Sequence, residues 1–260
     1  MDLEDYRKAL AEAEAAARAV GLMLRRNLYL PKKTNHESLH DIKLQLDVRS
    51  QASIERRLRR SFPAVAVLGE EGNRGATRAS ERWVIDPIDG TVNYAYGIPH
   101  ACVSIALQVR RERDFETVLG VVYDPFVGEC WTALRGGPAR LNGRVIHVSG
   151  RSRLREAIVT LGFAKSRKSL DLTLPLVRRL AHRVRKIRIM GSAALGLVYV
   201  ASGRMDAYLE PGVRLWDIAA GGLILECAGG AFWHEPLALR HAYRVRAHNG
   251  HLGGAIRKLK

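Results

Sequence analysis

The stretch that indicates the fold of this chain most clearly is Trp83-Val84-Ile85-Asp86-Pro87-Ile88-Asp89-Gly90-Thr91. Its apolar beginning predicts a buried strand, and two carboxylates three residues apart, Asp86 and Asp89, follow at the end of that strand. Pro87 fixes φ and lacks an amide hydrogen, so the chain turns sharply and both carboxylates can face one point. Because buried acids are costly to desolvate unless a cation binds them, the stretch predicts a divalent-metal site.

The residues that follow the two carboxylates are suited to binding an anion. Gly90 allows the backbone to approach a ligand closely, and Thr91 can begin a helix whose amide groups accept an anion. Taken alone, the pattern from Asp86 to Thr91 has a second interpretation that fits equally well, a helix N-terminus with acidic residues in its first turn. The pattern by itself leaves both interpretations open.

Two further acids favour the metal site. The apolar run 64–68 leads to Glu70, and Asp217 stands just before the apolar helical run 218–227. Together with the two aspartates above, four hard oxygen ligands come from three separated segments. Such a set is typical of a metal-dependent site rather than of surface charge.

The composition is that of a globular protein with one large domain or two intimate subdomains. Of its 260 residues, 47% are hydrophobic and 26% are charged, which is ordinary for such proteins. No apolar run is long enough to span a membrane, and the acidic, amphipathic start at 1–5 is unlike a signal peptide. The three cysteines are scattered among apolar residues, which favours free thiols in a reducing compartment. We therefore expect a cytoplasmic protein with no membrane partner.

The net charge of +16 has two interpretations. Arginine-rich clusters recur along the chain, at 56–60, 110–113, 178–188 and 257–260. A solvated basic surface explains them most simply, whereas a functional interpretation is attraction for polyanions or steering of a phosphorylated substrate towards an acidic cleft. No aromatic residues interleave with these clusters, as a groove for single-stranded nucleic acid would require. Nucleic-acid binding is therefore expected only as a secondary property.

The periodicity of apolar residues changes near the middle of the chain. The first part predicts helices at 5–28 and 47–60, a polar loop at 32–35, and strands in an antiparallel meander. These strands are expected at 64–69, 82–86, 102–109, 118–124 and 129–134. The second part alternates strands (156–162, 186–190, 205–210) with helices (171–184, 192–202 and from 217 onwards). The pattern predicts an α/β (layered α+β) fold, with an N-terminal α+β subdomain at 1–146 and a C-terminal α/β subdomain at 147–260.

Taken together, these motifs resemble the inositol monophosphatase family over nearly the whole chain. The elements Gly69-Glu70-Glu71, Trp83 to Thr91 and Trp216 to Gly221 occur in the family's order and at familiar spacing. Further segments that fit are Gly120 to Pro125, Leu141-Asn142-Gly143, Gly191 to Leu195, Asp206 to Glu210 and Ala247-His248-Asn249. The resemblance implies the alternating α-β-α-β-α sandwich of inositol monophosphatases and fructose bisphosphatases, and a homodimer.

The resemblance also implies a Mg²⁺-dependent phosphatase that holds two to three ions. Glu70, Asp86 and the main-chain carbonyl of Ile88 would hold one Mg²⁺. Asp86, Asp89 and Asp217 would hold a second, with Asp86 bridging the two. A third, weaker ion near Glu70 would bring the attacking water.

Catalytic and substrate-side residues follow from the same resemblance. Thr91, paired with Asp47, would orient and deprotonate the water, and Glu70 completes the catalytic set. The residues implied to contact the phosphate or the alcohol are Asp89, Gly90, Thr91, Gly191, Ser192, Ala193, Glu210 and Asp217. A carboxylate such as Glu210 suits a polyhydroxylated substrate, because it accepts hydrogen bonds from hydroxyl groups.

The expected activity is hydrolysis of inositol monophosphate or a related sugar or polyol phosphate, a small-molecule phosphate monoester. Cations are needed because the dianionic ester repels hydroxide and the leaving alkoxide must be stabilised. Rival activities on related scaffolds are fructose-1,6-bisphosphatase and 3'(2'),5'-bisphosphate nucleotidase, although Thr91-Val92-Asn93-Tyr94 resembles inositol monophosphatases more than the nucleotidases. A rival of another class is a protein that binds RNA or transcription complexes through its basic surface.

Overall fold

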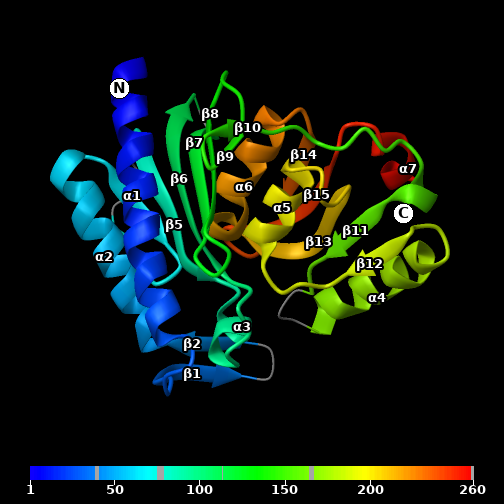
Figure 1. Cartoon of the computed structure of the whole chain (residues 1–260), viewed down its shortest axis with the longest axis horizontal. Helices are drawn as coiled ribbons and strands as arrows, with labels where there is room; N and C mark the ends of the chain where they lie inside the picture. The colour runs from blue at the N-terminus through cyan, green and yellow to red at the C-terminus, as the bar shows by residue number, and fades with distance from the viewer. Residues whose placement is uncertain (39–40, 75–78, 113, 164–166, 259–260) are drawn as a thin grey trace.

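The chain forms two β-sheets that alternate with layers of helices (Figure 1). The computed structural model describes residues 1–38, 41–74, 79–112, 114–163 and 167–258. From the N-terminal side of Figure 1, a pair of helices, the larger sheet, a second pair of helices, the smaller sheet and a last helical layer follow one another. The fold is therefore the expected α-β-α-β-α sandwich.

The larger sheet comes from the first half of the chain. In spatial order its strands are β10 (Arg144–Val145), β9 (Arg140–Leu141), β8 (Glu129–Leu134), β7 (Asp114–Asp124), β6 (Cys102–Arg111), β5 (Glu81–Asp89), β3 (Ala66–Gly69) and β4 (Gly72–Arg74). Strands β5 to β8 pair antiparallel, as the predicted meander requires. Strand β3 instead runs parallel to β5, so the two strands end at the same edge of the sheet.

The smaller sheet comes from the second half and is mixed. In spatial order its strands are β12 (Lys186–Arg188), β11 (Ile158–Leu161), β13 (Ala207–Arg214), β15 (Ala242–His248) and β14 (Ala231–Pro236). Strand β11 runs parallel to both β12 and β13. Parallel neighbours need crossover connections, and here the helices α4 (Arg167–Ala181) and α5 (Ala193–Ala201) supply them.

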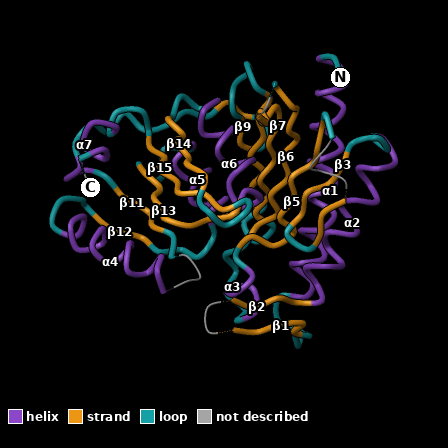
Figure 2. The backbone as a smooth tube through the Cα atoms, turned by 180° about the vertical axis from the view of Figure 1, so that it is seen from behind, coloured by secondary structure: helices purple, strands orange, loops and turns teal. Residues whose placement is uncertain are grey.

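Helices α1 (Leu3–Asn27) and α2 (Gln45–Ser61) cover the outer face of the larger sheet in both views (Figures 1 and 2). Helix α1 begins two residues earlier than predicted because Asp2 and Asp5 form a capping box: Asp2 Oδ1 accepts from the Asp5 amide at 2.8 Å, and Asp5 Oδ2 accepts from the Asp2 amide at 3.1 Å. Small side chains on its inner face let it lie close to the sheet; these are Ala9, Ala13, Ala16 and Ala17.

Helices α5 and α6 (Leu215–Cys227) fill the layer between the two sheets. Most of their residues are buried, as is typical of helices covered on all sides. Helix α6 approaches β7 so closely that a Cβ added at Gly120 would lie 2.7 Å from the carbonyl oxygen of Ala220. Gly120 therefore sets how deeply α6 packs against the larger sheet.

The outer face of the smaller sheet carries α4 and the short helix α7 (Gly253–Arg257). The remaining elements are α3 (Thr91–Ala95), a 3₁₀ turn (Leu154–Glu156) and a hairpin of β1 (Thr34–Ser38) and β2 (Asp41–Leu44). Among the described residues, no helix combines the length and the apolar character that crossing a membrane would require.

The structure differs from the predicted elements most clearly in two places. The polar loop expected at 32–35 runs into β1, whose polar residues carry no apolar alternation and are ordered by pairing with β2. Strands β14 and β15 were not predicted, although Ala242, Val245 and Ala247 of β15 are buried.

The two large sheets use residues 66–145 and 158–248. We keep the division into 1–146 and 147–260 as a proposal, because α6 of the second half packs on the sheet of the first.

We predict that Gly120→Ala lowers the free energy of unfolding by about 1–3 kcal/mol, because the new methyl group forces α6 away from β7. Urea unfolding measures the change. Gly150→Ala is the matched control: no atom outside its chain neighbours lies within 4 Å of a Cβ at Gly150, so a change within about 0.5 kcal/mol is expected. Equal stability of the two variants would contradict the close packing.

Candidate metal centre

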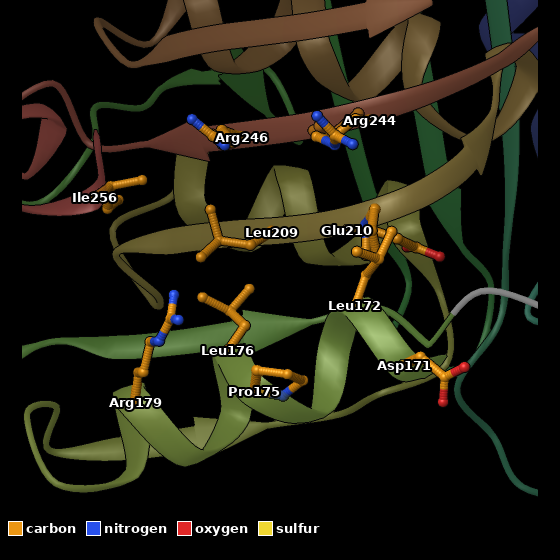
Figure 3. A pocket seen from close by; sticks show the side chains of 12 residues that line it. Asp171, Leu172, Pro175, Leu176, Arg179, Leu209, Glu210, Arg244, Arg246 and Ile256 are labelled. Atoms are coloured by element: carbon orange, nitrogen blue, oxygen red, sulfur yellow. The ribbon is translucent and has the colours of Figure 1, made fainter. Parts of the chain in front are cut away.

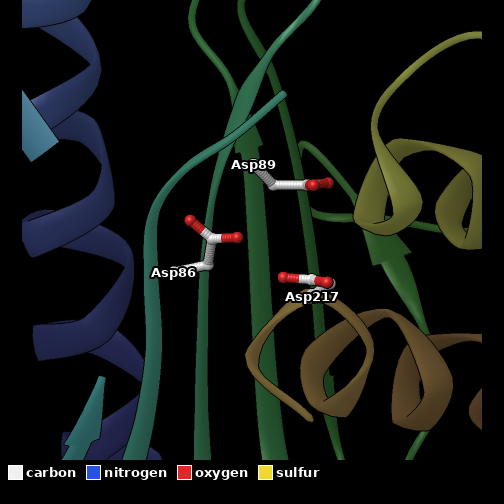
Figure 4. A group of neighbouring side chains, drawn as sticks. All are labelled: Asp86, Asp89 and Asp217. Atoms are coloured by element: carbon white, nitrogen blue, oxygen red, sulfur yellow. The ribbon is translucent and has the colours of Figure 1, made fainter. Parts of the chain in front are cut away.

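Three carboxylates converge where strand β5 ends and helix α6 begins. Asp86 and Asp89 belong to β5, Asp217 lies in the first turn of α6, and one oxygen of each lies within 4.8 Å of the others. Figure 4 shows the three side chains pointing into one common space. The structure thus brings together three of the four acids that the sequence singled out as ligands.

A β-bulge makes this convergence possible. Residues three apart on a regular strand point to opposite faces of the sheet. Asp86 pairs with Ser104 and Asp89 with Cys102, so β5 advances by three residues while β6 advances by two. The extra residue turns both carboxylates to one side, and Pro87, which has no amide hydrogen to pair, sits within the irregularity.

Each of the three carboxylates accepts hydrogen bonds that orient it. Asp86 Oδ1 accepts from the Ile88 amide at 2.9 Å, and Asp217 Oδ2 accepts from the Arg214 amide at 3.0 Å. Asp89 Oδ2 accepts from the Ser192 hydroxyl at 2.5 Å and from the Ala194 amide at 2.7 Å. Asp89 therefore connects the metal candidates to the beginning of α5.

Glu70 neighbours these three carboxylates but is not among the acids whose oxygens lie within 4.8 Å of one another. Its amide donates to the Ile85 carbonyl at 3.2 Å, and since Gly69 pairs with Ile85, Glu70 follows β3 next to Asp86. Its charge helps to raise the pKa of Asp86, Asp217 and Asp47. Glu70 is thus within electrostatic reach of the centre that the sequence predicted it to join.

The electrostatics of the cluster fit a divalent cation. Burial raises the pKa of Asp86 well above its usual 3.8, and the charges of Glu70 and Asp217 raise it further. Burial, Asp89 and Glu70 likewise raise the pKa of Asp217. A cation relieves this repulsion by favouring the ionised carboxylates, and hard oxygen ligands are those that Mg²⁺ and Ca²⁺ prefer.

Asp47 is buried near the cluster with an unused oxygen. Its Oδ2 accepts from the Leu44 amide at 2.6 Å, while Oδ1 has no hydrogen-bond partner in the described part of the chain. Burial, together with the charges of Glu70 and Glu71, raises the pKa of Asp47 to about 8. Burying a carboxylate oxygen without a partner costs free energy unless a ligand binds it. The free oxygen of Asp47 therefore also fits a polar or cationic ligand.

The turn between β5 and α3 holds Thr91 near the carboxylates. The Thr91 hydroxyl donates to the Ile88 carbonyl at 2.8 Å, and no hydrogen bond joins Thr91 to Asp47 among the described residues, so the implied pairing is not formed here. Gly90 has φ of 97° and its Cβ would lie 2.9 Å from the His100 carbonyl oxygen, so only glycine suits this turn.

The residues expected on the substrate side fall into two groups. Gly191, Ser192 and Ala193 form the approach to α5 and its first turn, where the Ala193 amide lies 3.4 Å from Asp89 Oδ1. Glu210 is buried on β13 and accepts a short hydrogen bond from the Tyr208 hydroxyl. The first group contacts the carboxylate cluster through Asp89.

Sequence reasoning missed the residues that hold these parts together across the two halves. The Ser104 hydroxyl donates to the Trp216 carbonyl at 3.1 Å, which ties β6 to the beginning of α6. The Asn93 side-chain amide donates a hydrogen bond to the Met190 carbonyl, in the loop before α5. Because each contact spans about a hundred residues, spacing along the chain carries no signal of it.

A cavity of about 360 Å³ lies at the outer face of the smaller sheet (Figure 3). Residues of α4, β13, β15 and α7 line it, with arginines on both sides of an apolar centre: Arg179, Arg244 and Arg246 surround Leu172, Leu176 and Leu209. Glu210 is the one predicted site residue in its lining, and none of the three clustered aspartates contributes. The cavity is therefore separate from the carboxylate cluster.

Comparisons with known proteins agree on one family. The inositol monophosphatase family matches residues 5–249. Inositol monophosphatase 2 of Solanum lycopersicum is 36% identical over 254 residues, which cover 93% of this chain and 93% of that protein. The Nus factor SuhB of Xylella fastidiosa is 41% identical over 224 residues, covering 83% and 78%. The crystal structure of extragenic suppressor protein suhB from Bartonella henselae superposes with a TM-score of 0.88 at 31% identity, over 97% of this chain and 98% of that one.

We predict that Mg²⁺ raises the melting temperature more at higher pH. Folded Asp47 keeps its proton up to a pKa of about 8, whereas the unfolded chain loses it near 3.8, so without metal the stability falls as pH rises through this window. The raised pKa values of Asp86 and Asp217 act in the same direction. Since Mg²⁺ binds the deprotonated carboxylates, the difference between Mg²⁺ and a chelator should widen from about pH 6 to about pH 8.5 in thermal unfolding.

Two variants check the origin of this difference. Asp86→Asn should abolish it. Asp206→Asn removes another buried carboxylate, one that accepts from the Ile158 amide at 2.7 Å before β13 begins, and should lower both melting temperatures while leaving their difference intact. A difference that is independent of pH, or that survives in Asp86→Asn, would refute the metal centre.

Proposed function

This chain belongs to the inositol monophosphatase family, and we propose that it hydrolyses inositol monophosphate or a related sugar or polyol phosphate with the help of Mg²⁺. Family membership makes it a phosphatase by class. The observation that carries the proposal is the convergence of Asp86, Asp89 and Asp217 within 4.8 Å, next to Glu70 and to the beginning of α5. Three clustered acids with Glu70 beside them suit a metal-dependent reaction better than a covalent one.

We propose the following ligands for two to three Mg²⁺ ions: Glu70, Asp86, the Ile88 carbonyl, Asp89 and Asp217. The raised pKa values of Asp86 and Asp217 and the bulge that turns Asp86 and Asp89 to one side support this set. Bound there, Mg²⁺ would neutralise the phosphate dianion, stabilise the leaving alkoxide and lower the pKa of water.

We propose that Asp47 and Thr91 orient the attacking water and accept its proton. The free Oδ1 of Asp47, a buried oxygen with no hydrogen-bond partner among the described residues, suits a base that accepts a proton from water. The Thr91 hydroxyl, which donates to the Ile88 carbonyl, keeps its oxygen lone pairs available to a water molecule. Glu70, beside Asp86, is the third residue of this catalytic set.

The alcohol and phosphate contacts are proposed from the same arrangement. The amides of Gly90 and Thr91 would donate to phosphate oxygens, which the turn at Gly90 permits. Ser192 and Ala193, at the beginning of α5, and Gly191 before them would face the alcohol, together with Glu210, which can accept from substrate hydroxyl groups. Asp89 and Asp217 would serve both metal and substrate.

Turnover of inositol 1-phosphate with and without Mg²⁺ tests the proposal. We expect Mg²⁺-dependent phosphate release that falls by about 100-fold or more in Asp89→Asn, because that variant loses one ligand charge. Glu226→Gln, which removes a half-exposed surface acid, is the control and should retain full activity.

Substrate rank is measured in the same assay. Fructose 1,6-bisphosphate and a 3',5'-bisphosphate nucleoside are the rival substrates, and the highest kcat/KM identifies the class. Folded wild-type protein that releases phosphate from none of the three would refute the proposed activity.

A second candidate function, binding of RNA, is favoured by one surface. The last turn of α4 and the chain through β12 expose six basic side chains, and among the described residues none of them has an ion-pair partner: Arg178, Arg179, Arg183, Arg185, Lys186 and Arg188. A relative named Nus factor SuhB supports considering this function. Helix α4 covers the outer face of the smaller sheet and β12 is an edge strand of that sheet, so this basic surface is separate from the three clustered aspartates.

Salt-dependent binding of single-stranded RNA, followed by fluorescence anisotropy, tests this second function. Replacing Arg183, Arg185 and Arg188 by Gln should weaken binding about tenfold and flatten its dependence on salt, because phosphate contacts are lost. The control replaces Arg56, Arg57 and Arg60 of α2, on the opposite side of the molecule, by Gln; it removes an equal charge and also the ion pair of Arg57 with Glu12. Equal loss in both triple variants would indicate unspecific attraction by the net charge of +16.

The remaining proposals concern assembly and place of action. On the family resemblance we propose a homodimer that acts in the cytoplasm. The scattered cysteines, free in the described structure, agree with a reducing compartment.

A further inference from the structure

One side chain joins the metal side of the centre to its substrate side without being a candidate ligand. Asn93, half-buried in the short helix α3, donates from Nδ2 to the His100 carbonyl at 2.9 Å and to the Met190 carbonyl at 2.8 Å. These acceptors lie 7 and 97 residues away along the chain. A single amide group thus links the first half of the chain to the loop before α5.

The first acceptor closes the turn that follows β5. The His100 carbonyl oxygen would lie 2.9 Å from a Cβ at Gly90, so it packs directly against the Gly90 backbone. By holding this carbonyl, Asn93 keeps the segment after α3 against the turn that carries Asp89 and Thr91. The bond therefore acts on the metal side of the centre.

The second acceptor holds the loop on the substrate side. Met190 is followed by Gly191 and then by Ser192, whose hydroxyl donates to Asp89 Oδ2 at 2.5 Å. The Gly191 backbone lies against Asn93, since a Cβ there would be 3.0 Å from Asn93 Nδ2. The loop is accordingly attached twice, once through Asp89 and once through Asn93.

The two attachments differ in what a bound cation does to them. Asp89 Oδ2 accepts from Ser192 and Ala194, so a cation that draws on this carboxylate competes with its bonds to α5. The amide of Asn93 is neutral, donates only to carbonyls, and is untouched by that competition. Asn93 is therefore the attachment that persists when Asp89 binds a cation.

We propose that Asn93 is a positioning residue that keeps the Met190–Ser192 loop in register with Asp89, so that the metal ligand and the substrate-side residues stay aligned. The inference rests on the proposed function, since it assumes that Asp89 binds a cation and that Ser192 and Ala193 face the substrate. Residues that orient metal ligands without binding the metal themselves typically contribute about 10- to 100-fold to metal affinity or activity.

Binding of Mn²⁺ to the apo protein, followed by the electron paramagnetic resonance of free Mn²⁺, tests the inference without substrate. Asn93→Ala should raise the Mn²⁺ dissociation constant about tenfold. In turnover assays the same variant should raise KM for the phosphate ester more than it lowers kcat, because the substrate-side loop is released while the reacting groups remain.

Two further variants separate positioning from general loss of structure. Asn93→Leu fills the space of the amide without donors, and should bind Mn²⁺ as weakly as Asn93→Ala. Asn249→Ala is the matched control: Asn249 Nδ2 also donates twice, to Ser149 Oγ at 3.0 Å and to the Arg151 carbonyl at 2.8 Å, near the opposite end of β13. It should lower the melting temperature and leave Mn²⁺ affinity and KM unchanged.

The outcomes distinguish this inference from the proposed function. Wild-type Mn²⁺ affinity in Asn93→Ala, or its restoration in Asn93→Leu, would overturn the role of Asn93 even if the enzyme is an active phosphatase. Binding of Mn²⁺ without turnover of any phosphate ester would refute the activity, and weaker Mn²⁺ binding in both Asn93 variants would still support the positioning role. Wild-type protein that binds no Mn²⁺ would overturn the metal centre and this inference together.

Discussion

Repulsion among buried carboxylates is the constraint on which the rest of this structure depends. Asp86, Asp89 and Asp217 share one space, with oxygens within 4.8 Å, and burial raises the pKa of Asp86 and Asp217. At such a distance two ionised groups repel by roughly 3 kcal/mol even at an effective dielectric constant of about 20. The fold can keep the acids together only if protons or cations neutralise them, which connects stability, pH and metal binding in one site.

The sandwich brings positive partial charges to this place from two helices of the second half of the chain. Helices α5 and α6 lie between the two sheets and begin at the centre: the Ala194 amide donates to Asp89, and Asp217 occupies the first turn of α6. Amides at helix N-termini stabilise carboxylates. Gly120 lets α6 approach β7, so the same packing that fills the middle layer also places Asp217 opposite β5.

Much of this was predictable from local patterns. The strands β3, β5, β6, β7 and β8 and the helices α1, α2, α4, α5 and α6 lie near their expected ranges, because their apolar residues recur with the period of the element. Strand β1 escaped prediction because its polar residues carry no such period, and β2, in which only Ile42 and Leu44 alternate with polar residues, is too short to be recognised. The cluster of Asp86, Asp89 and Asp217 followed from acids placed at element ends, whereas Asn93 and Ser104 did not, since their partners are distant in sequence.

The sequence by itself determined which residue types could bind a cation, where the strands and helices that carry them lie, and, through several motifs in order, the family. The tertiary structure alone decided which acids meet. The bulge opposite β6 turns Asp86 and Asp89 to one side, α6 adds Asp217, and Glu70 stays at the margin. The reason is physical: periodicity is set by local backbone geometry, whereas convergence depends on packing between segments more than a hundred residues apart.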